Sequence, residues 1–163
     1  MKSDRLQLRP FEDSDLDALH ALWTDPDVRR YLWENLELSR DDTAKLLARS
    51  RQMFEDEKTG LLAVTPADGD ELIGFGGFWY FGEPPRRQIL FGLAPEHWGM
   101  GLASELARLL ITHGFETLGD SKVIGATDSS NISSQRVMEK AGMKFDRRDR
   151  SGSRDIMYFV ARR

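Results

Sequence analysis

The sequence has 163 residues, of which 40% are hydrophobic and 31% charged, with a formal net charge of −4 and no cysteine. A chain of this length can bury a core of its own, so we expect one domain over residues 1–163. The lack of cysteine excludes disulfides, thiolate metal ligands and a thiol nucleophile. The acidic balance argues against nucleic acid as a partner, because phosphates bind clustered lysine and arginine.

The sequence shows no targeting or membrane-spanning segment. Residues 1–10 lack the apolar stretch of a signal peptide, and no run approaches the roughly 20 apolar residues that cross a bilayer. We therefore expect a cytoplasmic protein with no membrane partner. A late arginine-rich stretch is interpreted as a solvated hairpin that keeps an edge strand from pairing. Its members are Arg147, Arg148, Arg150 and Arg154.

The first third of the chain predicts one strand followed by three helices. Apolar and polar residues alternate over residues 6–10, as in a strand, and Ser14 stands where it can cap the first helix. Pro26 interrupts that helix, and a short helical piece follows at 28–32. A third helix is expected after an acidic capping box that begins at Ser39.

The rest of the chain predicts hairpins and then alternating strands and helices. Short apolar runs separated by turn residues indicate three antiparallel strands, and the helical period returns after Pro95. Two closing strands are joined by a turn at Gly152. The expected strands are 61–64, 72–81, 88–93, 123–127, 143–146 and 156–161, and the expected helices are 102–114 and 133–140.

The segment from Leu93 to Glu105 is the most informative for function. It leads from a strand, through Gly99-Met100-Gly101, into the first turn of an amphipathic helix. A helix start offers unpaired N–H groups and a positive dipole end, and glycines let a phosphate approach the backbone. We interpret the segment as a pyrophosphate site, with a tight turn that binds nothing as the alternative. A Rossmann-type dinucleotide oxidoreductase is disfavoured, because the loop follows hairpin strands.

Two segments together resemble the GNAT acetyltransferase superfamily. Trp98-Gly99-Met100-Gly101-Leu102-Ala103 is similar to the family pattern Arg/Gln-x-x-Gly-x-Gly/Ala, and residues 131–143 resemble its second signature, Asn-x-x-Ser followed by Glu-Lys-x-Gly-Phe/Met. The opening Asp4-Arg5-Leu6-Gln7-Leu8-Arg9-Pro10 resembles the branch that acetylates the N-termini of ribosomal proteins (RimJ/RimL-like). The resemblance implies an α/β (α+β) fold: a mixed, mostly antiparallel sheet of about seven strands with helices on both faces.

The resemblance also implies acetyl-coenzyme A as cosubstrate and no metal. It sets the backbone of Leu93 and Ala94 against the pantetheine arm and Asn131 near the thiol end, with Ser134 at the matching serine. The implied pyrophosphate segment consists of Trp98, Gly99, Met100, Gly101, Leu102, Ala103 and Ser104. From the residues alone, helix capping explains Asn131 and Ser134 equally well. For Trp98, a role as core anchor is favoured over contact with the ligand.

The sequence favours a direct chemical mechanism. It has no cysteine, no Gly-x-Ser-x-Gly elbow and only scattered histidines, which argues against an acyl-enzyme or a metal hydrolase. We expect a neutral primary amine to attack the thioester directly. The strand glutamate that many family members use as base is matched here by Gln88, which cannot take a proton. Gln88 would then orient a water or the substrate, while Asp128, Glu83, His97 or bulk water accepts the proton.

The amine acceptor is expected between the early helices and the central strands. The candidate lining residues are Tyr31, Trp33, Glu34, Phe78 and Tyr80. Strand alternation turns half of the aromatic run 78–81 into the core. The acceptor is a protein N-terminus or a small-molecule amine, and a homodimer is left open. A coenzyme A binding module without catalysis is the alternative function, because the strand glutamate is missing.

Overall fold

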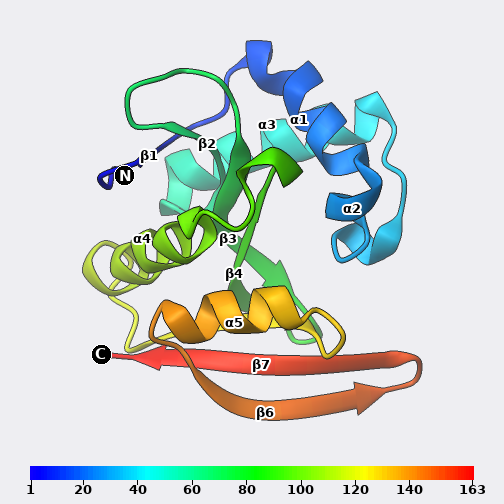
Figure 1. The fold of residues 1–163 in the computed structure, drawn as a ribbon, viewed down its shortest axis with the longest axis vertical. Helices are drawn as coiled ribbons and strands as arrows, with labels where there is room; N and C mark the ends of the chain where they lie inside the picture. Colours follow the sequence, from blue (N-terminus) through cyan, green and yellow to red (C-terminus); the bar gives the residue numbers. More distant parts are fainter.

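A computed structural model describes the backbone of residues 1–163 and every side chain except that of Ser151. Its centre is a seven-stranded sheet with the order β1-β2-β3-β4-β5-β7-β6 (Figure 1). Strands β4 and β5 are parallel, and the other neighbouring pairs are antiparallel. The strands are β1 (Leu6–Arg9), β2 (Gly60–Pro66), β3 (Gly74–Phe81), β4 (Arg86–Leu93), β5 (Lys122–Asp128), β6 (Lys144–Ser151) and β7 (Arg154–Arg162).

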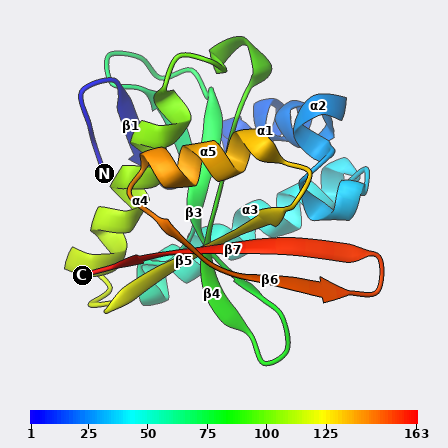
Figure 2. The ribbon, with the colours of Figure 1, turned by 60° about the horizontal axis from the view of Figure 1, so that its bottom comes forward.

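Helices cover both faces of this sheet. Figure 2 shows α4 and α5 on one side, with α3 and α1 behind the strands. The helices are α1 (Leu16–Thr24), α2 (Pro26–Arg29), α3 (Arg40–Glu57), α4 (Leu102–Glu116) and α5 (Ile132–Lys140), with short 3-10 turns at Asp13–Asp15, Trp33–Asn35 and Pro95–His97. The predicted mostly antiparallel sheet with helices on both faces is confirmed.

Each face has its own hydrophobic cluster. Leu106 and Leu110 of α4 pack with Phe159 of β7 on one side of the sheet. Trp23 of α1 packs with Phe75 of β3 on the other side, where the two rings meet edge to face at 5.6 Å between centroids. The sheet therefore separates two cores, which share no buried side chain among the described residues.

The helix starts test the capping expectations. At α3 the Ser39 hydroxyl accepts the Asp42 N–H at 3.1 Å, and the Asp42 carboxylate accepts the Ser39 N–H at 3.1 Å, so the predicted capping box is confirmed. The expected Ser14 cap is wrong. Ser14 lies inside a 3-10 turn, and the chain is held there by Asp15, which accepts the Glu12 N–H at 2.7 Å.

The second helix begins earlier than the sequence predicts. Pro26 occupies its first turn, and the Asp25 carboxylate accepts the N–H groups of Asp27 and Val28 at 2.9 and 3.2 Å. Proline is favourable there, because the first N–H of a helix has no partner to lose. Pro26 thus both ends α1 and starts α2.

The arginine-rich hairpin lies at the edge of the sheet, as predicted. Strand β6 is the edge strand, and Arg148 donates from Nε to the Asp155 carboxylate of β7 at 2.6 Å. The Arg147 guanidinium stacks 3.8 Å from the centroid of the Tyr158 ring. Among the described residues, no helix combines the length and the apolar character that a bilayer crossing requires.

The feature that positions the site is the divergence of β4 from β5. The whole of β4 pairs with β3, whereas its parallel pairing with β5 is recorded at Ile89 and Gly125. Beyond this point, toward the C-terminal ends of both strands, the sheet opens. The backbone of β4 past Ile89 therefore has one edge without a neighbouring strand.

Gly77 provides a test of how closely β2 and β3 approach. A Cβ there would lie 2.0 Å from the Gly60 carbonyl oxygen, which is backbone and cannot rotate away. We expect Gly77→Ala to lower the free energy of unfolding by about 1–3 kcal/mol, as overpacking does. The matched control is Gly69→Ala, whose Cβ would meet Pro66 at 3.7 Å. Denaturant titration should show Gly69→Ala within about 0.5 kcal/mol of wild type; equal stabilities of the two variants would contradict the packing argument.

Candidate active site

A groove of about 570 Å³ occupies the opening between β4 and β5. Its walls come from the end of β4, the loop before α4, the first turn of α4, and α5. Residues of α2 and the following turn close it on the other face. Of the predicted cofactor residues, the groove is lined by Leu93, Trp98, Gly99, Gly101, Leu102, Ala103, Ser104, Asn131 and Ser134.

The backbone of β4 is oriented by its ladder with β3. The Ala94 N–H donates to the Ile73 carbonyl at 2.9 Å, so the backbone hydrogen-bonding groups of Ala94 face β3. Because the groups of successive residues alternate between the two sides of a strand, those of Phe91 and Leu93 face the groove. The expectation for Ala94 is therefore wrong, and Ala94 does not line the groove. Phe91, which does, was not identified from the sequence.

The loop before α4 has the backbone shape that the sequence implied. Gly99 and Gly101 have φ angles of 74° and 78°, a region in which side chains other than glycine are strained. Gly101 is the N-cap of α4 and supplies no side-chain acceptor. The N–H groups of Leu102, Ala103 and Ser104 begin the helix, where amides lack intrahelical partners. The groove thus ends at a set of free donors.

Two expectations about this loop are wrong. Trp98 is not a core anchor: it is 49% exposed, and its indole N–H donates to the Leu93 carbonyl at 2.7 Å. Met100 does not line the groove, and its carbonyl accepts Nη1 of Arg5 at 2.9 Å. Trp98 therefore ties the loop to the end of β4, and Met100 faces outward.

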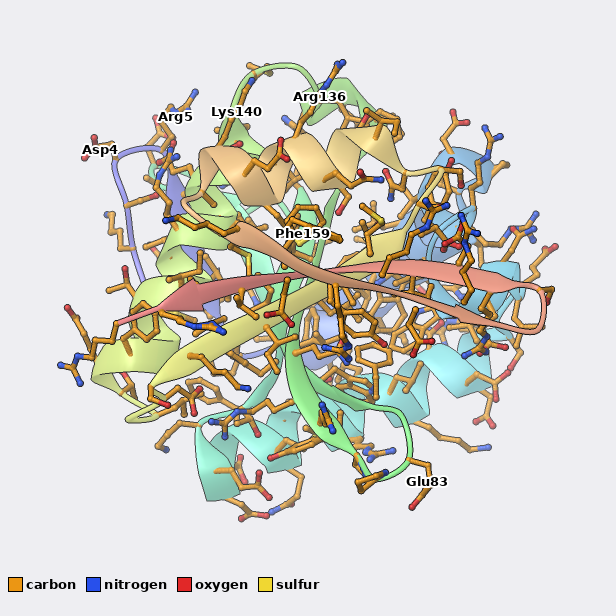
Figure 3. All side chains as sticks on the ribbon, turned by 90° about the horizontal axis from the view of Figure 1, so that it is seen from below. Asp4, Arg5, Glu83, Arg136, Lys140 and Phe159 are labelled. Atoms are coloured by element: carbon orange, nitrogen blue, oxygen red, sulfur yellow. The ribbon has the colours of Figure 1, made fainter. Side chains whose placement is uncertain are left out.

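Helix α5 forms the opposite wall. Asn131 caps it, accepting the Ser134 N–H on Oδ1 at 3.2 Å, and both residues also line the groove. Arg136 and Lys140, one helical turn apart, line the groove as well. Figure 3 shows these two cations along the same edge of the molecule as Arg5. Their spacing of four residues is the signal that could have identified them from the sequence.

A second cavity, of about 490 Å³, lies between the β3–β4 and β6–β7 hairpins. Gln88 lines it, is 7% exposed and stands opposite Trp79 in the ladder, so its side chain is on the face of α1–α3. The other lining residues are Phe81, Gly82, Glu83, Pro84, Arg86, Arg147, Asp149, Arg154, Ile156 and Tyr158. The guanidinium groups and Tyr158 in this cavity were not predicted to line an acceptor site.

The early aromatic residues divide between surface and core. Tyr31 lines the groove and donates its hydroxyl to the Ser130 carbonyl at 3.5 Å. Trp33 packs edge to face between Trp23 and Trp79, at 5.5 and 5.9 Å, and lines neither cavity. The expectation that Trp33 lines an acceptor pocket is therefore wrong.

The two carboxylates that were expected near the amine, those of Glu34 and Asp128, line neither cavity. Glu34 forms an ion pair with Arg154, so its charge is already compensated, and it lines neither cavity. Asp128 is half-buried at the end of β5, opposite Ile156, and also lines neither cavity. His97 lines the groove and Glu83 the second cavity.

Phe78 and Tyr80 do not line the site. Phe78 is 2% exposed and belongs to the cluster beneath α4, on the face opposite Gln88. Tyr80 donates its hydroxyl to Glu57 at 3.0 Å, at the end of α3. Strand alternation explains the error, because Trp79 and Phe81 turn toward the α1–α3 side. Among the described side chains, no three His, Asp or Glu residues are grouped to hold a metal ion.

A mostly antiparallel sheet, split between two parallel strands and opening onto an uncapped helix start, defines the fold class of coenzyme A-dependent acetyltransferases. A family model described as "Acetyltransferase (GNAT) domain" matches residues 5–144, and the chain belongs to this family. It is therefore an N-acetyltransferase that uses acetyl-coenzyme A.

Named relatives and solved structures agree with this assignment. The uncharacterized N-acetyltransferase YoaA of Bacillus subtilis is 30% identical, over 88% of this chain and 82% of the relative. The uncharacterized N-acetyltransferase YnaD of the same organism is 33% identical, over 86% and 79%. The crystal structure of a GNAT acetyltransferase from Bacillus anthracis superposes with a TM-score of 0.84 at 27% identity, covering 99% of this chain and 97% of that one.

Asn131 offers a test of the α5 start that does not depend on catalysis. We expect Asn131→Ala to lower the free energy of unfolding by about 1 kcal/mol, because an N-cap acceptor is lost. For a chain of this size the melting temperature should fall by roughly 2–4 °C. Asn131→Ser keeps an acceptor and should restore most of this loss. Ser133→Ala is the control, because no hydrogen bond is recorded for the exposed Ser133 side chain; a loss as large as that of Asn131→Ala would argue against the cap.

Proposed function

We propose that acetyl passes directly from acetyl-coenzyme A in the groove to a primary amine that enters through the second cavity. One observation carries the proposal: β4 borders both spaces, with Gln88 facing the second cavity and Ile89 to Leu93 lining the groove. The two reactants can therefore meet beside a single strand, at the point where β4 and β5 separate. Holding them there converts a bimolecular encounter into an effectively unimolecular step.

The groove fits coenzyme A at each of its chemical parts. The free amides of Leu102, Ala103 and Ser104, at the positive end of the α4 dipole, suit a pyrophosphate. Arg136 and Lys140 suit phosphate oxygens on the opposite wall. The groove-facing backbone of Phe91 and Leu93 suits the amides of the pantetheine arm, which would continue the sheet. Asn131 would then lie toward the thiol end.

The chemistry assigned to this chain is positioning and charge stabilisation. Bound acetyl-coenzyme A would supply the acyl group as a thioester: a C–N bond would form to the amine as the C–S bond breaks, and coenzyme A would leave as a thiolate that takes a proton from water. The Phe91 N–H faces the opening of the sheet and can donate to the oxygen on which negative charge develops. Gln88 has an amide, which does not titrate, so it orients the amine or a water rather than taking the proton. Asp128 lines neither space, so we assign the proton to a water in the second cavity, from which it can pass to Glu83, the candidate acceptor that lines that cavity.

The acceptor is proposed to be a primary amine of a small molecule or of a protein N-terminus. Spermidine N(1)-acetyltransferase of Escherichia coli, 27% identical over 86% of this chain and 74% of its own length, is named for a polyamine substrate. The second cavity here carries both signs of charge, with Arg86 and Arg147 near Glu83 and Asp149. This lining suits an amine that has further polar groups better than a purely cationic chain.

Ala103 allows the pyrophosphate site to be tested without damage to the helix. An aspartate in the first turn of α4 is favourable for the helix dipole, yet it repels a bound phosphate. We expect Ala103→Asp to retain the melting temperature of the free protein and to lose the stabilisation that millimolar coenzyme A gives the wild type. Ala67→Asp, in the β2–β3 turn, adds the same charge elsewhere and should keep that stabilisation. A full coenzyme A shift in Ala103→Asp would place the phosphates elsewhere.

Gln88 allows the transfer itself to be tested. A panel of amines that contains spermidine, an aminoglycoside, amino acids and N-terminal peptides is assayed for acetylated product by mass spectrometry. On the best acceptor, Gln88→Ala should lower kcat without changing the shape of the pH–rate profile, because an amide contributes no titration. Gln88→Glu should add an acidic limb, with the rate falling as the new carboxylate is protonated.

Three results would count against this assignment. If no amine on the panel is acetylated while coenzyme A binds, the chain is a coenzyme A binding module. If Gln88→Ala leaves kcat unchanged, Gln88 does not contact a reactant. If the wild-type profile shows an acidic limb that Glu83→Gln removes, the assignment of the proton to water is wrong.

A further inference from the structure

The first strand reaches the loop before α4 through one arginine. Arg5 donates from Nη1 to the Met100 carbonyl at 2.9 Å and from Nε to the Glu105 carboxylate at 2.8 Å. Its own backbone N–H donates to Glu105 at 3.1 Å, and the Ser3 hydroxyl donates to the same oxygen at 2.7 Å. We call this set of contacts, made by Ser3 and Arg5 to Met100 and Glu105, the Arg5 brace.

The Arg5 brace sets the direction in which the Met100 carbonyl points. A carbonyl that faced the groove would repel a phosphate, whereas the Met100 carbonyl is held outward by a guanidinium. The Arg5 Nη2 atom also lies 3.6 Å from where a Gly101 Cβ would stand, so Arg5 contacts the loop directly at its N-cap residue. With the carbonyl fixed outside, the amides that begin α4 remain directed at the groove.

The brace also compensates a carboxylate close to the anion site. Glu105 lies in the first turn of α4, where its charge would compete with a bound phosphate for the helix dipole. Burial by itself would raise the pKa of Glu105, but hydrogen bonds from Ser3 and Arg5 outweigh burial and hold that pKa below its usual value. The carboxylate is therefore ionised at neutral pH, and Arg5 balances it.

We propose that Arg5 is a positioning residue for the nucleotide end of coenzyme A: it orients the Met100–Gly101 backbone and neutralises Glu105, without contacting the reacting atoms. The inference rests on the proposed placement of the pyrophosphate at the start of α4. It predicts that Arg5 affects only ligands that carry the pyrophosphate. Figure 3 shows Arg5 on the same edge as Arg136 and Lys140, far from Glu83 beside the second cavity.

A matched arginine on the same strand serves as control. Arg9 also pairs with a carboxylate, donating to both oxygens of Asp15 at 2.7 and 2.9 Å, but it has no recorded contact with the loop. The Arg9–Asp15 pair is more buried than the Arg5–Glu105 pair, with side-chain exposures of 21% and 7% against 49% and 14%. Because exposed pairs contribute little to stability, Arg9→Met should lower the melting temperature at least as much as Arg5→Met.

The test measures coenzyme A affinity by titration calorimetry in wild type, Arg5→Met, Arg5→Lys and Arg9→Met. Arg5→Met should raise the Kd about tenfold, the effect of one lost charge-assisted hydrogen bond. The Kd of Arg5→Lys should lie between those of wild type and Arg5→Met, because an ammonium cannot bind the carbonyl and the carboxylate with the two-pronged geometry of a guanidinium. Arg9→Met should leave the Kd within about twofold of wild type. With S-acetylpantetheine, a donor that has no pyrophosphate, Arg5→Met should keep the wild-type kcat/KM.

Each outcome decides the inference. An unchanged Kd in Arg5→Met, an equal loss of affinity in Arg9→Met, or an equal loss of kcat/KM with S-acetylpantetheine would overturn it. If the wild type binds coenzyme A but acetylates no amine, the proposed transfer fails and the calorimetric comparison alone decides the role of Arg5. If the wild type does not bind coenzyme A, both proposals fall.

Discussion

The separation of two parallel strands is the constraint on which the rest of this structure depends. A strand edge within a sheet must find hydrogen-bond partners, and β4 loses its neighbour β5 after Ile89. Residues of α4 and α5 wall the space beside the exposed edge. A ligand with amide groups of its own can complete the sheet there. The proposed cofactor site is thus a consequence of incomplete strand pairing.

The elements around this opening contribute different kinds of positive charge and hold the loop between them in place. The start of α4 supplies fixed amide dipoles, while α5 supplies the exposed cations Arg136 and Lys140. Trp98 and Arg5 hold the connecting loop from its two ends, through the Leu93 and Met100 carbonyls. Arg5 satisfies the Met100 carbonyl outside the groove, and Trp98 satisfies the Leu93 carbonyl that faces it, so the groove retains donors. A site for an anion is obtained without a buried unpaired charge.

The sequence predicted what depends on local chemistry. The capping box at Ser39, the cap at Asn131 and the glycine loop follow from residue type and short spacing, and the structure has all three. Sequence-based prediction failed where long-range packing determines which way a side chain faces. Phe78 was assigned to the wrong face of its strand, Trp33 was expected to line the acceptor pocket although its ring packs between Trp23 and Trp79, and Trp98 was placed in a core although it is half exposed. Arg5 was noted within a motif, but its contact with Met100 spans 95 residues and has no local signature.

The two hydrophobic clusters have a consequence for how such a protein can change. The cluster beneath α4 and α5 supports the walls of the groove, whereas Glu83, Arg147 and Asp149, which line the second cavity, belong to neither cluster. Substitutions at sites that share no partners add nearly independently. Mutations at these lining positions can therefore accumulate and reshape the second cavity, while the packing around the groove is kept. Related proteins with this fold can thus differ in the amine that they accept while the groove between β4 and β5 stays the same.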